Sequence, residues 1–293
     1  MRIAQYLDGE ILRLGLVEGD ELIEIGTGAD GIRATTRDLL DAGADGLKAA
    51  QRAASRASRR PLCGVRLAPP VRPRKFLGLG LCYASHAREM ERRGMAIPSH
   101  QIWFNKQITA VNGPYDPIHL PRVSPCLDYE GELALVIGKR GRHIAARDAM
   151  SFVAGFMVCN DVSVRDWQQR SPTAMLGKSF DTHGPIGPWL TTIDEMSDPA
   201  SLSIRTWVDG ELRQDGNTAE MIWSFGQMIE ELSTVFTLEP GDVLSTGTPA
   251  GVGQGFDPPR FLKAGQRVRV EIEGLGHIEN LVVPEPSPTQ AEG

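Results

Sequence analysis

Residues 128–138 read Asp128-Tyr129-Glu130-Gly131-Glu132-Leu133-Ala134-Leu135-Val136-Ile137-Gly138. The apolar half of this stretch predicts a buried strand, and two carboxylates stand two residues apart at its start. Because alternate side chains of a strand point to the same face, we expect Glu130 and Glu132 to lie side by side. Two carboxylates at that distance repel each other unless one is protonated or a cation lies between them. The stretch therefore predicts a cation site at the mouth of a buried strand.

A third carboxylate follows the next apolar run of the chain. Residues 152–159 predict a second buried strand, and Asn160-Asp161 comes directly after it. Glu130, Glu132 and Asp161 would together make an all-oxygen site suited to Mg²⁺ or Mn²⁺, with Ca²⁺ as a further option. The spacing alone leaves two other interpretations open, a solvated strand edge and a turn capped by Asp161.

Composition is that of a soluble metabolic enzyme. The chain has 293 residues and a formal net charge of −6, and its Lys and Arg residues are scattered, which argues against a nucleic-acid partner. No apolar run is long enough to span a bilayer, and the N-terminus carries no apolar signal core. We therefore expect no membrane partner and a cytoplasmic location.

The chain is expected to divide near residue 70. Residues 1–70 predict a small N-terminal α+β domain, with three short strands (1–7, 12–17 and 21–25), a helical stretch (36–59) and a proline-rich linker. Residues 71–284 predict a β-rich main domain, with helices at 145–150 and 220–236, the second introduced by Asn217-Thr218. Residues 285–293 are expected to form a disordered tail.

Two groups outside the carboxylate cluster are candidates for proton chemistry. His86 and Glu89 stand three apart in a charged helical segment, so they share a face, and the carboxylate can orient the imidazole. Lys178 can hold a carboxylate or a developing oxyanion near a metal. On spacing alone, a solvated surface position is the favoured interpretation for each of these side chains.

Six ordered motifs between Phe76 and about Val283 resemble the fumarylacetoacetate hydrolase family, including its acylpyruvases and 2-hydroxyhepta-2,4-diene-1,7-dioate isomerases. They are residues 78–86, 128–134, 160–168, 177–182, 187–189 and 241–253. The resemblance implies a mixed α/β fold built on a β-sheet roll, a small N-terminal domain and a homodimer. Two departures from the family motifs bear on substrate identity. Cys82 replaces a common Asn, and the family's frequent F-L-K-P motif reads Phe104-Asn105-Lys106-Gln107 here.

The resemblance also implies roles for individual residues. Glu130, Glu132 and Asp161 would bind the metal, while His86 and Glu89 would activate water on a mobile lid that continues to Pro98. Lys178 would stabilise developing charge. The substrate-binding residues implied are Tyr83, Lys106 near the acyl end, Arg165 and Gln168 at the oxo-acid end, and Gly247 with Thr248 in a glycine-rich turn.

These parts predict an enzyme that hydrolyses a carbon–carbon bond of a 2,4-dioxo acid, because the departing carbon can leave as the enolate of pyruvate held by a divalent metal. The expected substrate is of the acylpyruvate or fumarylpyruvate type. The same site also suits an oxaloacetate decarboxylase or a keto–enol tautomerase, since both reactions pass through an enolate. A non-catalytic metal-binding protein is the alternative from another class.

Overall fold

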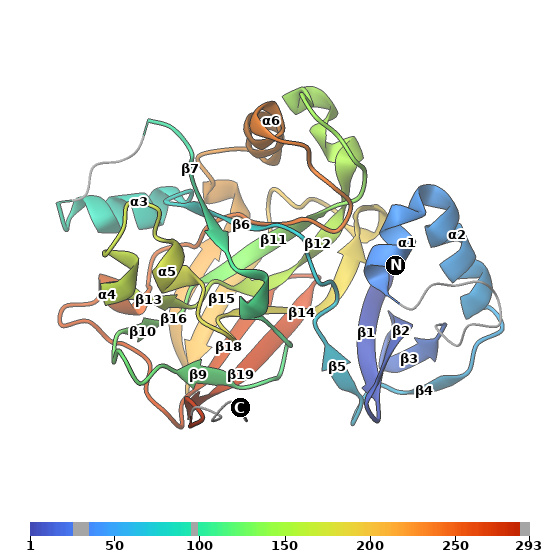
Figure 1. Ribbon diagram of the computed structural model, residues 1–293, viewed down its shortest axis with the longest axis horizontal. Helices are drawn as coiled ribbons and strands as arrows, with labels where there is room; N and C mark the ends of the chain where they lie inside the picture. Colours follow the sequence, from blue (N-terminus) through green and yellow to red (C-terminus); the bar gives the residue numbers. More distant parts are fainter. Residues whose placement is uncertain (26–34, 95–98, 288–293) are drawn as a thin grey trace, which may run out of the picture.

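A computed structural model describes residues 1–25, 35–94 and 99–287. The chain is a mixed α/β protein rich in strands, as the sequence predicts (Figure 1). Its strands are β1 (Arg2–Asp8), β2 (Ile11–Glu18), β3 (Glu21–Glu24), β4 (Arg59–Pro61), β5 (Arg66–Ala68), β6 (Phe76–Gly80), β7 (Ile102–Lys106), β8 (Val111–Asn112), β9 (Ile118–Leu120), β10 (Leu127–Asp128), β11 (Gly131–Ile137), β12 (Val153–Asn160), β13 (Ser163–Val164), β14 (Gly184–Thr192), β15 (Ser203–Val208), β16 (Glu211–Asn217), β17 (Val243–Ser245), β18 (Arg267–Ile272) and β19 (Gly276–Pro284).

The helices are short and lie mostly outside the sheets. The α-helices are α1 (Thr36–Asp41), α2 (Gly43–Ala54), α3 (Ala84–Glu91), α4 (Arg165–Gln168), α5 (Met175–Lys178) and α6 (Phe225–Val235). The 3₁₀ turns are η1 (Ile108–Ala110), η2 (Ala146–Phe152), η3 (Ile193–Glu195), η4 (Thr218–Glu220) and η5 (Gly253–Gly255). Among the described residues, no helix is long and apolar enough to cross a membrane.

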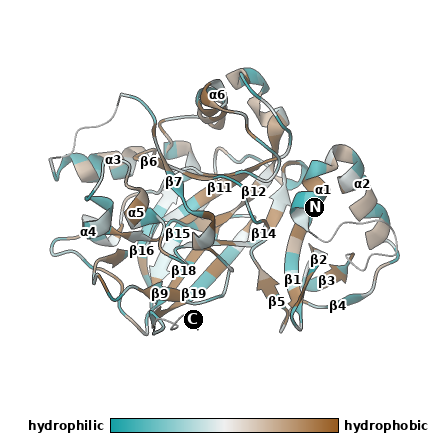
Figure 2. Ribbon diagram, viewed as in Figure 1, coloured by the Kyte–Doolittle hydropathy of each residue, from teal (hydrophilic) through white to brown (hydrophobic). Residues whose placement is uncertain are grey.

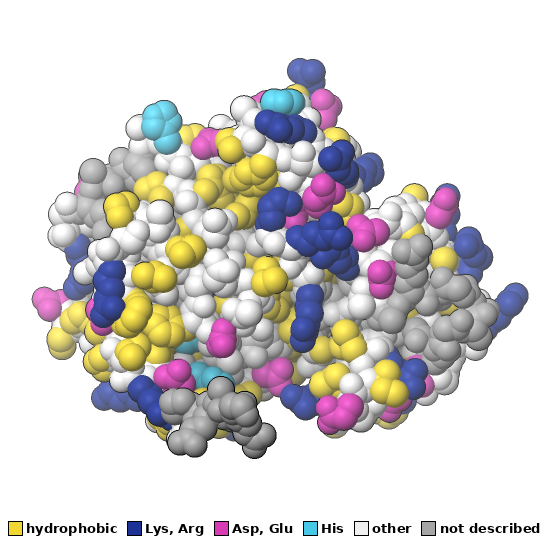
Figure 3. Space-filling model, in the orientation of Figure 1, with side chains coloured by type: hydrophobic (Ala, Val, Ile, Leu, Met, Phe, Trp, Pro, Cys, Tyr) yellow, Lys and Arg dark blue, Asp and Glu magenta, His cyan; other side chains and the backbone are white. Residues whose placement is uncertain are grey.

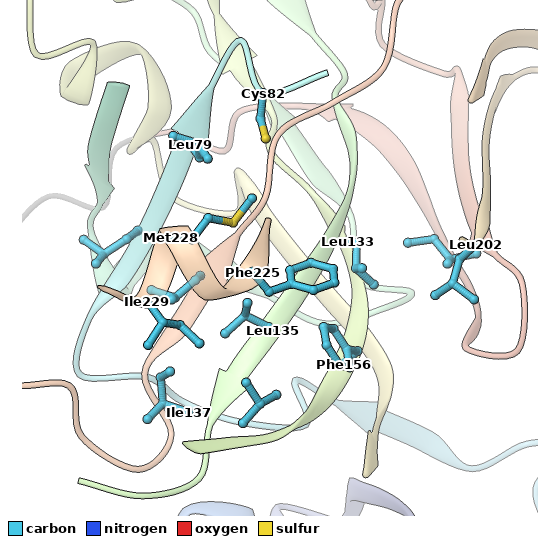
Figure 4. Close-up of a cluster of buried hydrophobic side chains, with 14 of the residues drawn as sticks. Leu79, Cys82, Leu133, Leu135, Ile137, Phe156, Leu202, Phe225, Met228 and Ile229 are labelled. Carbon is cyan, nitrogen blue, oxygen red and sulfur yellow. The ribbon is translucent and has the colours of Figure 1, made fainter. Parts of the chain in front are cut away.

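The largest sheet runs in the order β4-β3-β2-β1-β14-β12-β11-β17-β6-β7. Its central strands β11 and β12 are antiparallel and completely buried. Leu133, Leu135 and Ile137 point from one face of β11 into a cluster that includes Phe225 and Met228 of α6 (Figure 4). The even-numbered side chains from Ala134 onwards face the other core, towards the N-terminal strands. Both faces are therefore apolar, which explains the continuous run of hydrophobic residues.

The N-terminal strands continue this sheet. β1 pairs with β14 in the register Arg2↔Thr191 and Ile3↔Leu190, and α1 and α2 flank the sheet there (Figure 1). The helical stretch expected over 36–59 differs in detail: it is divided at Gly43, which has φ +60°, and α2 ends at Ala54 before β4 begins. The apolar side of α2 packs on the core, and teal bands along both helices mark their hydrophilic residues (Figure 2).

A second sheet of five strands, β16-β15-β18-β19-β9, lies against the central strands of the first. Side chains of β15 and β18, such as Ile204 and Val270, share one core with Leu133 of β11. Acidic and basic residues are mixed over the surface seen in Figure 3, without a single-sign stripe. The two packed sheets hold the ends of β11 and β12 in place, and the carboxylates lie at those ends.

The expected helices of the main domain are shifted. Asn217 caps the short turn η4, whereas α6 begins five residues after the expected position 220, because Ser224 and Gln227 form a capping box of their own. The segment expected to be a helix at 145–150 is the 3₁₀ turn η2. Of the tail expected over 285–293, residues 288–293 lie outside the described part of the chain.

Candidate active site

The three predicted metal ligands lie together where β11 begins and β12 ends. In the antiparallel register Gly131 pairs with Asn160, and the Asp161 backbone N–H donates to the Glu130 carbonyl at 2.8 Å. Glu130, Glu132 and Asp161 are all buried, and their nearest carboxylate oxygens lie within 4.8 Å of one another. The strand pairing thus assembles a compact set of hard oxygen ligands from two stretches 30 residues apart.

Two of these carboxylates are neutralised by buried cations. Lys178 Nζ donates to Glu130 Oε2 at 2.5 Å and to Asp161 Oδ2 at 2.6 Å, and Arg165 Nη1 lies 2.7 Å from Glu130 Oε1. Burial would raise the pKa of Glu130, but the charges of Lys178 and Arg165 outweigh it and hold that pKa well below its ordinary value. Burial opposes the charge of Lys178, yet Asp161 and Glu130 raise its pKa. These contacts favour the ammonium form of Lys178, which donates to both carboxylates.

Glu132 is in a different electrostatic position. It accepts hydrogen bonds from Ser245 Oγ at 2.5 Å and from the Gly247 backbone N–H at 2.9 Å, and in the described chain no Lys or Arg pairs with it. Burial, followed by the charges of Asp161 and Glu130, raises its pKa well above the ordinary value. Positive charge is thus missing on the Glu132 side of the cluster. A divalent cation ligated by Glu130, Glu132 and Asp161 fits this deficit and the oxygen-only donor set.

Helix α3 places a histidine and its orienting carboxylate beside the cluster. His86 Nδ1 lies 2.9 Å from Glu89 Oε2, and the second oxygen of Glu89 accepts the Gly251 backbone N–H at 3.0 Å. His86 lines the same cavity as Glu130 and Glu132. With Nδ1–H donating to Glu89, Nε2 is left as the nitrogen able to accept a proton. Residues 95–98, expected to continue this segment as a lid, lie outside the described residues.

Arg165 and Gln168 lie on the short helix α4 at the cavity wall. Arg165 Nε donates to Asp128 Oδ2 at 2.8 Å, and Nη1 donates to Gln168 Oε1 at 3.0 Å. Its Nη2 is buried and has no hydrogen-bond partner among the described residues. Asp128 also accepts the backbone N–H groups of Gly253 and Gln254, at 2.7 and 2.9 Å. This role of Asp128 in joining α4 to the 253–254 loop was missed in the sequence, because no local pattern signals a partner 125 residues away.

The cavity itself has a volume of about 250 Å³. Its charged and polar lining includes Glu130, Glu132, Lys178, His86, Arg165, Gln168 and Thr248. The remaining surface is largely apolar, and its larger side chains include Leu81, Met90, Ile102, Phe104 and Val252. A lining that combines charged groups with an apolar surface suits a small organic acid whose reacting atoms lie at the carboxylates.

Three residues expected to bind substrate are not among those that line this cavity. Tyr83 is fully buried, and neither it, Lys106 nor Gly247 lines the cavity as described. Lys106 Nζ donates to Asp161 Oδ1 at 2.6 Å and to the Val162 carbonyl at 3.3 Å, so it fixes the position of the Asp161 carboxylate. The Gly247 backbone N–H donates a hydrogen bond to Glu132 Oε2. The substrate roles expected for these three residues stay predictions, and the contacts found for them come from long-range packing, which the motifs do not specify.

Phe104 also belongs to the site, although in the sequence it was noted only as the first residue of the stretch that departs from F-L-K-P. Its ring lies 4.8 Å from Lys178 Nζ, in cation–π contact, and it lines the cavity. The ring thus shields one side of the ammonium ion from water. An aromatic residue two positions before Lys106 in an alternating strand is the only sequence signal for it.

Comparison with known proteins gives consistent relatives. Residues 75–283 match the family model described as fumarylacetoacetate (FAA) hydrolase C-terminal. The mitochondrial oxaloacetate tautomerase Fahd2a of Rattus norvegicus is 44% identical over 270 residues, which cover 90% of this chain and 85% of the relative. Among solved structures, a fumarylacetoacetate hydrolase from Exiguobacterium antarcticum superposes with TM-score 0.85 at 34% identity, covering 97% of this chain and all of the other. A maleylpyruvate hydrolase from Sphingobium sp. SYK-6, in complex with manganese(II) and pyruvate, gives TM-score 0.81 at 34% identity, covering 98% of this chain and all of the other.

Proposed function

The chain belongs to the fumarylacetoacetate hydrolase family, and from that premise we propose that it is a metal-dependent keto–enol tautomerase of a small 2-oxo diacid such as oxaloacetate. The observation that carries the proposal is that His86, held by Glu89, lines one cavity together with Glu130 and Glu132 of the carboxylate cluster. Curated relatives that are oxaloacetate tautomerases, at 44% identity over 270 residues and 49% over 219 residues, support this choice of reaction and substrate. Relatives described as putative hydrolases are 48% identical over 204 residues, so identity alone does not choose the reaction.

The metal would be held by Glu130, Glu132 and Asp161, with Mg²⁺ or Mn²⁺ as the expected ions. When bound there, it would act as a Lewis acid towards the carboxylate and 2-oxo oxygens of the substrate and so acidify the neighbouring C–H bond. Lys106 and Lys178 hold Asp161 in place, and Arg165 with Lys178 does the same for Glu130. The second sphere of the site is therefore built into the fold.

Tautomerisation moves one proton, and His86 is placed to carry it. A C–H bond at carbon 3 breaks and an O–H bond at the carbon 2 oxygen forms, or the reverse, with no water consumed and no change in oxidation state. His86 Nε2 would accept the proton, while Glu89 holds the ring by Nδ1–H and stabilises the imidazolium that results. Lys178 remains charged and would stabilise the negative charge that develops on oxygen.

Arg165 provides a binding group for a substrate carboxylate. Its Nη2 is buried without a partner among the described residues, whereas its other nitrogens bind Asp128, Glu130 and Gln168. A buried N–H donor left unpaired is costly, so a carboxylate that accepts it gains a charge-assisted hydrogen bond. Gln168, held by Arg165, would orient the same end of the substrate.

A second candidate is hydrolysis of an acylpyruvate-type 2,4-dioxo acid. The apolar part of the cavity, with Leu81, Met90 and Ile102, favours it because a four-carbon diacid leaves those side chains without an apolar partner. In that reaction His86 would deprotonate water for attack on the distal carbonyl. Decarboxylation of oxaloacetate, a homodimeric state and a cytoplasmic location also remain predictions, and the names of several relatives say mitochondrial.

The test is an ultraviolet assay of the enol of oxaloacetate with purified protein. We expect the enol signal to decay faster in the presence of protein and Mg²⁺ or Mn²⁺, to return to the uncatalysed rate with chelator, and to recover when the ion is restored. His86→Ala should remove at least about 99% of the acceleration. Product analysis separates the alternatives, because pyruvate with carbon dioxide would indicate decarboxylation. No acceleration by metal-loaded protein would contradict the proposal.

A further inference from the structure

Gln214 lies behind the cavity wall, on strand β16 of the second sheet. It is 1% exposed and does not line the cavity, yet its amide connects two parts of the site. The Gly131 backbone N–H donates to Gln214 Oε1 at 2.9 Å, and Gln214 Nε2 donates to Thr248 Oγ1 at 2.7 Å and to the Pro249 carbonyl at 2.9 Å. Gly131 stands between Glu130 and Glu132, and Thr248 lines the cavity. One buried amide thus links the metal-ligand strand to the substrate-facing turn.

The direction of every hydrogen bond in this ring is fixed by the backbone. A peptide N–H can only donate and a carbonyl can only accept, so Gly131 N–H and the Pro249 carbonyl set which end of the Gln214 amide is oxygen. Thr248 Oγ1 must then accept from Gln214 Nε2, and it donates its own proton to the Gly131 carbonyl at 2.9 Å. The proton of the Thr248 hydroxyl is therefore committed, and its oxygen keeps one free lone pair.

Close packing keeps the turn seated on β16. A Cβ atom on Gly216 would lie 2.5 Å from Pro249 Cβ, so only glycine lets the turn approach the strand this closely. Gly131 is restricted in the same way, since its Cβ would lie 2.2 Å from Thr206 Oγ1. The short amide bridge through Gln214 depends on both approaches. β16 is thereby a support for the site and not only an edge of the second sheet.

We propose that Gln214 is a positioning residue that presents Thr248 Oγ1 to the cavity as a hydrogen-bond acceptor. An acceptor at this place binds a ligand hydroxyl group and discriminates against an oxygen that carries no proton. This inference rests on the proposed function, in which the enol tautomer has a hydroxyl at carbon 2 and the keto tautomer has none. Thr248 would then contact the tautomer that carries the proton, whereas the ionised carboxylates of the substrate are left to Arg165 and Lys178.

Calorimetric titration of the Mn²⁺-saturated protein with malate and with succinate tests the inference without turnover. The two diacids differ by one hydroxyl group, so the ratio of their dissociation constants reports the contact. We expect Thr248→Val to reduce the preference for malate about two- to tenfold, the usual value of one neutral hydrogen bond, and Thr248→Ser to retain it. Gln214→Met should reduce the preference as much as Thr248→Val does, and the double variant should lose no more than either single variant.

Thr206→Val is the matched control. Thr206 is another buried hydroxyl beside Gly131, and its Oγ1 has no hydrogen-bond partner in the described chain, so this variant should leave the ratio unchanged. Circular dichroism checks that each variant folds, and Gln214→Asn, whose shorter amide cannot span Gly131 and Thr248, replaces Gln214→Met if the latter does not fold. An unchanged ratio in Thr248→Val or in the folded Gln214 variant overturns the inference. A protein without tautomerase activity that still shows the expected ratios would contradict the proposed function alone.

Discussion

Replacing Glu89 by Gln tests the tautomeric state of His86 directly. In the structure each oxygen of Glu89 has one donor, His86 Nδ1–H at 2.9 Å and the Gly251 N–H at 3.0 Å. A glutamine side chain has only one oxygen. That oxygen must accept the hydrogen bond from the Gly251 peptide N–H, because two donors cannot face each other. The amide NH₂ of the new side chain would then point at His86 Nδ1. The imidazole can accept that bond only with its proton on Nε2, which is the nitrogen that must act as base.

The expected loss of activity is correspondingly large. A positioned general base contributes about 10²- to 10⁴-fold, so Glu89→Gln should lower kcat for enol conversion at least about 100-fold, or about 2.7 kcal/mol in the activation free energy. His86→Ala should lose a similar amount, and the double variant should be little slower than either single variant, because the two residues act as one unit. If the losses of the two single variants were instead additive, the double variant would lose at least about 10⁴-fold, and the two residues would not act as one unit.

The assay is the metal-saturated turnover of oxaloacetate, with Glu89→Asp as the matched variant. Aspartate keeps both acceptor oxygens and should retain more activity than glutamine, although its shorter side chain weakens one contact. Thermal unfolding of each variant controls for misfolding. Wild-type turnover by Glu89→Gln would refute the reasoning, since it would show that the Nδ1 contact does not set the state of the catalytic nitrogen.

Three further outcomes follow from the structure. Glu132→Gln should weaken Mn²⁺ binding about tenfold or more in calorimetric titration. The loss should exceed that of Ser245→Ala, which removes only a hydrogen bond to Glu132. Equal Mn²⁺ affinity of the parent and Glu132→Gln would exclude Glu132 as a ligand. Burial lowers the pKa of His183 to about 3, so its folded state stays neutral while the unfolded chain binds a proton below pH about 6.5. The contribution of His183 to stability is therefore full above that pH and falls as pH decreases, by about 2 kcal/mol at pH 5. In urea unfolding, the free energy of unfolding of His183→Gln should decrease less between pH 7 and 5 than that of the parent protein. Equal decreases in the two proteins would disprove this. Light scattering should give twice the mass of one chain, and a monomer would contradict the expected homodimer.

The carboxylate cluster was predictable because its geometry is nearly local. Strand alternation places Glu130 and Glu132 on one face, and the register Gly131↔Asn160 brings Asp161 to them. The family motifs then identified His86, Glu89 and Lys178, which the structure brings to the same site. The mixed, strand-rich fold followed from the same motifs.

The supporting residues were not predictable in this way. Gln214 reaches Gly131 from 83 residues away, and its role depends on how the second sheet packs on the first. Lys106, on β7, donates to Asp161 and to the Val162 carbonyl, and its motif does not specify either contact. Helix α6 begins at Phe225 because the capping box of Ser224 and Gln227 prevails over the earlier Asn217 signal.

The central claim is that the site moves a proton on a 2-oxo diacid and does not cleave a carbon–carbon bond. Proton magnetic resonance in D₂O with Mg²⁺ tests it most directly, with oxaloacetate and acetylpyruvate as parallel substrates for one enzyme sample. We predict that the carbon 3 protons of oxaloacetate exchange with solvent deuterium faster with enzyme than without it, and that the carbon skeleton stays intact. The kcat/KM for this exchange should exceed that for acetylpyruvate cleavage at least about tenfold, equivalent to about 1.4 kcal/mol. Rapid formation of acetate and pyruvate from acetylpyruvate, with no acceleration of exchange in oxaloacetate, would contradict it.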